Sequence, residues 1–188
     1  LFPKIQQEVH EQLDRTLFTT YQEPWGNLFD KGHWLVAPFY RENEPIAEAH
    51  KRFPVTSKFL QSLPRHKPNF STFSFLRPQT HIVAHHGITN MRVRVQLGIL
   101  VPPGCALQVG KVKREMTQGE AWAFDDSFLH EAWNPSDEAR LILSFDVWHP
   151  YLDDQEISYL HELLGYLEKH PINQQWLETY HGGDYDYL

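Results

Sequence analysis

The sequence predicts a mainly β protein folded as a double-stranded β-helix, the jelly-roll or cupin-like arrangement, with flanking helices at the N- and C-terminal ends. Between residues 70 and 150, apolar residues recur with the period of two that strands require, and turn-forming residues interrupt the pattern every few positions. Many short strands with frequent turns are typical of sandwiches and jelly rolls. The eight expected strands are Phe70–Leu76, Thr80–His85, Met91–Val101, Ala106–Val109, Lys111–Met116, Ala121–Phe124, His130–Trp133 and Arg140–Trp148.

Helical periodicity flanks this region. Pro3 opens a segment whose apolar residues lie on one face of a helix that reaches Leu17. Residues 21–54 have the composition of long loops with short strands. Pro54–Leu63 is expected to form a short helix.

A further helix is expected after the last strand. Asp153 or Asp154 caps it, and Pro171 follows it. We expect it to pack against the outside of the sheet, and residues 181–188 to be mobile. The single domain, 1–188, thus divides into an N-terminal helical and loop region (1–69), the jelly-roll core (about 70–150) and a C-terminal helical region (151–188).

Length and composition fit one domain with a hydrophobic core. The chain has 188 residues, 41% of them hydrophobic, and a net charge of −7 without a basic run. Nucleic acid and anionic membrane surfaces are therefore not expected partners, and no apolar stretch is long enough to span a bilayer. Cys105 is the single cysteine, so no disulfide can form within the chain. This favours a reducing compartment, and we expect a cytoplasmic protein.

Twelve histidines invite a search for metal ligands. His85 ends one expected strand and His130 begins another, and neutral imidazoles suit an iron ion with open coordination positions. A carboxylate usually follows the first histidine by two residues, where this chain has Gly87. Asp125 or Asp126 could accept the second N–H of the His130 imidazole, or both could belong to a turn. Taken alone, two histidines are more often surface or hydrogen-bonded core residues than ligands.

Arginines supply the second candidate feature. Arg140 could neutralise the far carboxylate of a dicarboxylic co-substrate, shared with the Ser74 hydroxyl, because a guanidinium binds carboxylates bidentately. An edge-strand surface charge explains Arg140 about equally well. Arg92, Arg94 and Gln96 lie on one face of a strand; this face is either solvated or lines a cavity for an acidic ligand.

The sequence resembles the aspartyl/asparaginyl β-hydroxylase family in four ordered blocks: THIVAHHGITN at 80–90, RVRVQLG at 92–98, FDDSFLHEAWN at 124–134 and RLILSFDVWHP at 140–150. The likeness covers roughly residues 25–152. It implies a hydroxylase that uses iron(II), 2-oxoglutarate and O2 and releases succinate and CO2. In this family two histidines hold the iron without an acid, so Gly87 fits the pattern.

The resemblance also implies roles for individual residues. Gln96 stands where family members commonly have histidine, so a co-substrate contact is altered. The implied site consists of the metal ligands His85 and His130, the 2-oxoglutarate-binding residues Ser74, Arg94, Gln96, Arg140 and Trp34, and the substrate-binding residue Arg92.

The expected substrate is an Asp- or Asn-containing peptide, or a small carboxylate or amide. Members that act on folded protein modules often carry upstream helical repeats, which these 188 residues do not contain. Three alternatives stay open: the same chemistry on a lipid acyl chain or other small molecule, a cupin-like zinc or iron protein without 2-oxoglutarate, and a non-catalytic metal-binding jelly-roll module.

Overall fold

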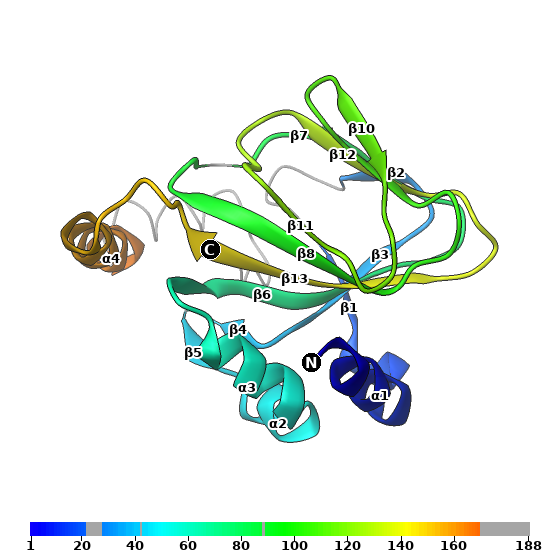
Figure 1. Cartoon of the computed structure of the whole chain (residues 1–188), viewed down its shortest axis with the longest axis horizontal. Helices are drawn as coiled ribbons and strands as arrows, with labels where there is room; N and C mark the ends of the chain where they lie inside the picture. The colour runs from blue at the N-terminus through cyan, green and yellow to red at the C-terminus, as the bar shows by residue number, and fades with distance from the viewer. Residues whose placement is uncertain (22–27, 42, 88, 170–188) are drawn as a thin grey trace.

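Two antiparallel β-sheets form a sandwich, and helices cover the outer face of the larger sheet (Figure 1). The computed structural model describes residues 1–21, 28–41, 43–87 and 89–169. The six-stranded sheet has the spatial order β1 (Thr19–Thr20), β3 (Trp34–Pro38), β6 (His66–Leu76), β13 (Arg140–Trp148), β8 (Arg92–Leu100) and β11 (Ala121–Phe124). The five-stranded sheet has the order β10 (Val112–Glu115), β9 (Ala106–Val109), β12 (His130–Asn134), β7 (Thr80–His85) and β2 (Phe29–Lys31).

The eight strands from β6 to β13 form a jelly roll. β6, β8, β11 and β13 belong to the six-stranded sheet, and β7, β9, β10 and β12 to the five-stranded sheet. The strand β13 pairs with β6 and β8, and β12 pairs with β7 and β9, always antiparallel. This alternation between two sheets is the predicted double-stranded β-helix. All eight expected strands are confirmed, with β6 beginning at His66 instead of Phe70.

Residues 21–54 contain more regular structure than the sequence predicts. β3 extends the larger sheet beyond β6, β2 pairs with β7, and β4 (Tyr40–Arg41) pairs with β5 (Glu44–Pro45). The expected short strands are thus confirmed. A helix, α2 (Ala47–Arg52), was not expected, because six residues are too few to show a clear helical period.

The first helix is shorter than predicted. α1 spans Phe2–Gln12, and Leu13 has extended backbone with φ −65° and ψ 112°. Asp14 then accepts a hydrogen bond from the Thr16 backbone N–H (2.9 Å), a local contact that competes with helix continuation. The prediction of one helix reaching Leu17 was wrong, although Leu13 and Leu17 still pack against the core.

The main hydrophobic core lies between the six-stranded sheet and helices α1, α2 and α3 (Pro54–Ser62). Phe39, Phe53 and Phe73 meet there edge to face, with ring centroids 5.0 to 6.0 Å apart, and none is more than 2% exposed. Each such side chain stabilises the fold by roughly 1.5–3 kcal/mol. Because the outer face supplies this apolar burial, the inner face of the same sheet can carry polar side chains.

The C-terminal helix, α4 (Asp154–Lys169), lies beyond the end of β13 (Figure 1). Asp153 caps it as predicted: its side chain accepts from the Glu156 N–H and the Glu156 carboxylate accepts from the Asp153 N–H, both at 2.8 Å. Tyr159 and Leu163 are more than half exposed. The expected packing against the outside of the sheet was wrong, because the chain leaves the sheet at the end of β13 before the helix begins.

Pro171 and residues 181–188, predicted to follow the helix and to be mobile, lie outside the described residues. None of the helices in the described ranges is long and apolar enough to cross a membrane.

Glu8 joins the first helix to the third. Its buried carboxylate accepts hydrogen bonds from the backbone N–H groups of Val55 and Thr56 (2.6 and 2.9 Å) and from the Thr56 hydroxyl (2.7 Å). N–H groups in the first turn of a helix have no partner within that helix. A carboxylate on α1 therefore caps α3 and favours its dipole.

We expect Glu8→Ala to lower the free energy of unfolding by about 2–4 kcal/mol, because buried donors lose a charged acceptor. Urea unfolding followed by circular dichroism measures this. The control is Glu11→Ala, which removes only an exposed contact with Gln7. Equal losses in the two variants would contradict the capping role of Glu8.

Candidate functional site

Two histidines meet at the end of the five-stranded sheet. His85 ends β7 and His130 begins β12, directly opposite it in register, with ring centroids 4.1 Å apart. The pairing shifts between His130 and Ala132, and such bulges re-aim side chains. The ring of Phe124, on β11, lies 5.4 Å from the His130 ring. The histidine pair therefore faces the space between the two sheets.

Backbone carbonyls orient both imidazoles. Nδ1 of His85 lies 2.8 Å from the Val83 carbonyl oxygen, and Nδ1 of His130 lies 2.9 Å from that of Phe128. A carbonyl can only accept, so each Nδ1 carries a proton and each neutral ring has an unprotonated Nε2. This is the state that binds metals. The hypothesis that an aspartate accepts the His130 N–H was wrong, because the backbone carbonyl of Phe128, two residues earlier, accepts it instead.

Burial keeps His130 neutral. Burial and, to a smaller extent, the neighbouring His85 together lower the pKa of His130 to about 4, against the hydrogen bond to Phe128. At neutral pH the ring is therefore available as a ligand. Within the described ranges, no group of three or more His, Cys, Asp or Glu side chains is arranged to hold a metal, so these residues offer a pair of imidazoles.

Asp126 fills the space beside Gly87. The Gly87 N–H donates to the Asp126 carbonyl (2.6 Å), and a Cβ on Gly87 would lie 2.5 Å from the Asp126 carboxyl carbon. No side chain at position 87 fits unless Asp126 moves. Asp126 is fully buried, and its Oδ1 has no hydrogen-bond partner among the described residues. Asp125, by contrast, accepts from the Ser127 N–H (2.9 Å), which confirms the turn interpretation for that residue.

Four charged side chains form one buried network. Arg92 lies 3.2 Å from Asp126 and 3.1 Å from Asp146, and Arg94 lies 3.2 Å from Asp126 and 3.0 Å from Asp146. Burial alone lowers the pKa of Arg94, but Asp146 and then Asp126 outweigh it and raise this pKa. The polar face of β8 therefore lines the interior instead of being solvated. Both of its guanidiniums are neutralised by carboxylates of the protein, as buried charges must be.

Arg140 is a buried guanidinium of a different kind. It is 1% exposed and belongs to β13, in the interior of the six-stranded sheet, so the alternative of an edge-strand surface charge is excluded. Its Nη1 donates to Met116 Sδ (3.5 Å), its Nε has no hydrogen-bond partner, and no carboxylate of the described ranges forms an ion pair with it. Burial lowers the pKa of Arg140 to about 10, which leaves it charged at neutral pH.

Ser74 and Trp34 lie on the same inner face of the six-stranded sheet as Arg140. Ser74, on β6, pairs with Ile142, two residues from Arg140 along β13. The Trp34 Nε1–H donates to the Ser74 hydroxyl (2.9 Å), and both side chains are buried. Because this hydroxyl already accepts from the indole, its proton can be donated to another acceptor.

Two further polar side chains occupy the middle of the inner face. Gln96 on β8 and Ser144 on β13 are direct register partners, and neither Gln96 Oε1 nor Ser144 Oγ has a hydrogen-bond partner among the described residues. Sequence reasoning did not single out Ser144 or Asp146. Their even spacing from Arg140 is the signal that could have found them, since period two places all three on one face.

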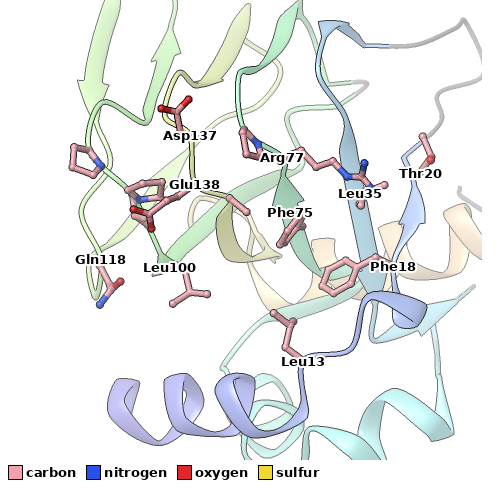
Figure 2. A pocket seen from close by; sticks show the side chains of 15 residues that line it. Leu13, Phe18, Thr20, Leu35, Phe75, Arg77, Leu100, Gln118, Asp137 and Glu138 are labelled. Atoms are coloured by element: carbon pink, nitrogen blue, oxygen red, sulfur yellow. The ribbon is translucent and has the colours of Figure 1, made fainter.

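A groove of about 1070 Å³ lies on the opposite side of the six-stranded sheet, beside α1 (Figure 2). Leu13, Phe75 and Leu100 line its apolar part, and Asp137 and Glu138 lie at its rim. None of the predicted site residues lines this groove. The structure instead brings all eight of them into the region between the two sheets.

Comparison with known proteins identifies the family of this chain. The model of the Aspartyl/Asparaginyl beta-hydroxylase family matches residues 2–150. The human Aspartyl/asparaginyl beta-hydroxylase is 34% identical over 134 residues, which are 69% of this chain and 18% of that protein. The mouse Aspartate beta-hydroxylase domain-containing protein 2 is 34% identical over 131 residues, 66% of this chain and 38% of that protein.

These two matches cover only part of each relative. The chain spans less than two fifths of the length of either protein. The family match alone, however, covers far more than half of the chain, from α1 to the end of β13. This chain belongs to the aspartyl/asparaginyl β-hydroxylase family.

Proposed function

We propose that this protein is an iron(II)- and 2-oxoglutarate-dependent hydroxylase that inserts oxygen into a C–H bond. The observation that carries the proposal is the Arg140 guanidinium, which is buried, has no carboxylate partner in the described ranges and shares the intersheet space with His85 and His130. A buried unpaired cation is costly unless a ligand supplies the anion. A dicarboxylate that also chelates a metal would satisfy both features at once.

The histidine pair fits an iron(II) ion. The Nδ1 atoms of both rings lie against backbone carbonyls, the His130 ring is neutral at neutral pH, and the two rings lie against each other at the end of the five-stranded sheet. Asp126, with its unpartnered Oδ1, supplies a nearby negative charge that raises the pKa of His130 against the effect of burial. When bound, iron and 2-oxoglutarate supply the oxidising chemistry that transfers an oxygen atom of O2, while the protein supplies position and charge.

Arg140 and Ser74 would hold the far carboxylate of 2-oxoglutarate. The guanidinium offers its unpartnered Nε, and Trp34 fixes the Ser74 hydroxyl as a donor. Gln96, together with Ser144, presents unpartnered polar atoms between this end and the Arg94 network. At these positions the Ser144 hydroxyl and the side-chain NH2 group of Gln96 would replace the donor that histidine provides in other family members.

Arg92 and Arg94 would act through the network they form. Arg94 is 9% exposed and is held by two carboxylates, so its contribution is to fix Asp126 and Asp146 beside the histidines. The side chains of Arg92 and Arg94 are similarly buried, at 12% and 11% exposed, but Arg92 is the first residue of β8, and this position at the strand end makes it the better placed of the two to contact a substrate. An acidic or amide group is the chemistry it would recognise.

The proposed substrate is an Asp- or Asn-type residue or amino acid, hydroxylated at its β-carbon. Support comes from the family and from the two relatives, whose names specify aspartyl, asparaginyl or aspartate β-hydroxylation. The same chemistry on a lipid acyl chain or another small molecule is the alternative. Succinate release, measured against free amino acids, Asp and Asn peptides and acyl lipids, separates these classes.

Anaerobic addition of iron(II) and 2-oxoglutarate should produce a visible metal-to-ligand charge-transfer band. We expect His85→Ala and His130→Ala to abolish the band and the turnover while the fold persists, because the ligands lie on strands that pack without them. Arg140→Ala should leave iron binding intact and raise the KM for 2-oxoglutarate at least about a hundredfold, as loss of a buried charge-assisted contact predicts.

Each outcome of this experiment is informative. A folded wild-type protein without the band would support a non-catalytic jelly-roll module. A band that Arg140→Ala leaves unchanged, with unchanged turnover, would support a cupin-like metal protein that does not use 2-oxoglutarate.

Gly87→Ala should destabilise the protein by about 1–3 kcal/mol, the usual cost of forcing a methyl group into filled space. Its Cβ would meet the Asp126 carboxylate at 2.5 Å, so we also expect weaker iron binding. Gly165→Ala in α4, where a Cβ meets nothing within 4 Å, is the control and should not destabilise. Thermal unfolding and iron titration measure the two effects; a Gly87→Ala protein as stable as wild type would show that Asp126 can move freely.

The metal-free protein should lose stability as the pH falls from about 6.5 to about 4. The pKa of His130 is lowered to about 4 in the folded state, against 6.5 ordinarily. In this window the unfolded chain binds a proton that the folded chain does not, so stability rises with pH and is fully present above 6.5. The contribution is roughly 1–3 kcal/mol. His130→Gln should flatten this part of the pH profile of urea unfolding; an unchanged slope would assign it to other groups.

A further inference from the structure

Among the described residues, the hydrogen-bond acceptor of the Arg140 guanidinium is a sulfur atom. The Nη1 group donates to the Met116 thioether at 3.5 Å. The Cys105 side chain is close enough to influence the charge of Arg140, and it is completely buried. Both sulfur-bearing residues lie in segments that flank the β9–β10 hairpin. This guanidinium thus has polarisable neighbours without a formal negative charge.

The thiol of Cys105 is kept neutral by burial and forms its hydrogen bond with Asn134. Burial raises the pKa of the Cys105 thiol, although Arg140 lowers it. The thiol donates to the Asn134 side-chain oxygen at 3.3 Å. Asn134 is itself fixed, because its amide donates to the carbonyls of Leu76, Arg77 and Glu138. Cys105 therefore does not neutralise the guanidinium.

Met116 is fixed in place by its backbone and by burial. Its N–H donates to the Cys105 carbonyl (2.8 Å), and its side chain is 8% exposed. A thioether is a weak acceptor. It can satisfy one N–H of Arg140 without removing the positive charge. The contrast is Arg94, whose guanidinium is paired with the carboxylates of Asp126 and Asp146.

We infer that Met116 is a positioning residue for the dicarboxylate: its thioether holds Arg140 in orientation while leaving the guanidinium charge free for a ligand. The inference rests on the proposed function, in which Arg140 binds the far carboxylate of 2-oxoglutarate. A carboxylate at position 116 would compete with that ligand. An aliphatic side chain would leave Nη1 without an acceptor and the guanidinium free to turn.

Three substitutions separate these properties. Met116→Leu keeps the volume and removes the acceptor, Met116→Gln restores a neutral acceptor, and Met116→Glu adds the competing charge. The matched control is Met91→Leu, the same chemical change at the chain's other methionine. Binding is read in iron-loaded protein without turnover, as the thermal shift caused by N-oxalylglycine, a dicarboxylate analogue. 2-Oxobutyrate, which has the keto acid end but no far carboxylate, is the matched monocarboxylate.

We expect Met116→Leu to weaken N-oxalylglycine binding about tenfold and to raise the KM for 2-oxoglutarate by the same factor, with kcat within about twofold. Met116→Gln should recover most of the affinity, and Met116→Glu should lose about a hundredfold. Binding of 2-oxobutyrate should not change in any of them, nor should Met91→Leu alter either ligand.

Two results would overturn the inference about Met116 alone. One is an unchanged dicarboxylate affinity in Met116→Leu, and the other is an equal loss for both ligands, which would indicate general disruption. In either case Arg140→Ala still reports on the proposed function, because it should abolish discrimination between the dicarboxylate and the monocarboxylate. If Arg140→Ala has no effect either, the proposed function fails with it.

Discussion

The buried charge of Arg140, for which the described residues provide no carboxylate partner, is the constraint on which the proposed ligand site depends. A charge in this position is normally paired or neutralised. Arg94, on the same inner face of the sheet, is paired in this way, because the carboxylates of Asp126 and Asp146 lie beside its guanidinium. The same sheet therefore contains one guanidinium that is paired with carboxylates and one for which the described residues provide no carboxylate, and this difference is the basis for proposing that Arg140 binds a ligand.

A polar interior is possible because the hydrophobic core lies elsewhere. Helices α1 to α3 cover the outer face of the six-stranded sheet, where phenylalanine rings pack at 5.0 to 6.0 Å. A second, smaller cluster around Trp34, Leu76 and Leu107 lies between the sheets. The strands are thus supported from outside, and mutation of the inner residues is expected to affect ligands before it affects folding.

The strands could be predicted from the sequence because period two is a local property, and all eight were found within a few residues. Contacts between distant segments were not accessible in that way. No pattern relates Met116 to Arg140 or Glu8 to Thr56. The carbonyls that orient His85 and His130 lie only two residues earlier in the chain, but a period of residue types does not show how a ring is oriented. The helical period that predicted one helix as far as Leu17 also failed, because α1 ends at Gln12 and Asp14 then forms a local hydrogen bond with Thr16. Family resemblance supplied roles that spacing alone left open.

The charges of the interior bear on the proposed substrate. Arg92 and Arg94 balance Asp126 and Asp146, so this network is neutral as a whole. If iron(II) and the dianion of 2-oxoglutarate bind as proposed, their charges would cancel, and Arg140 would leave one positive charge between the two sheets. In a site of low dielectric such an excess favours an anionic partner. A substrate carboxylate near Arg92 would complete neutrality, whereas an acyl chain would not, and this balance supports an aspartyl-type substrate over a lipid.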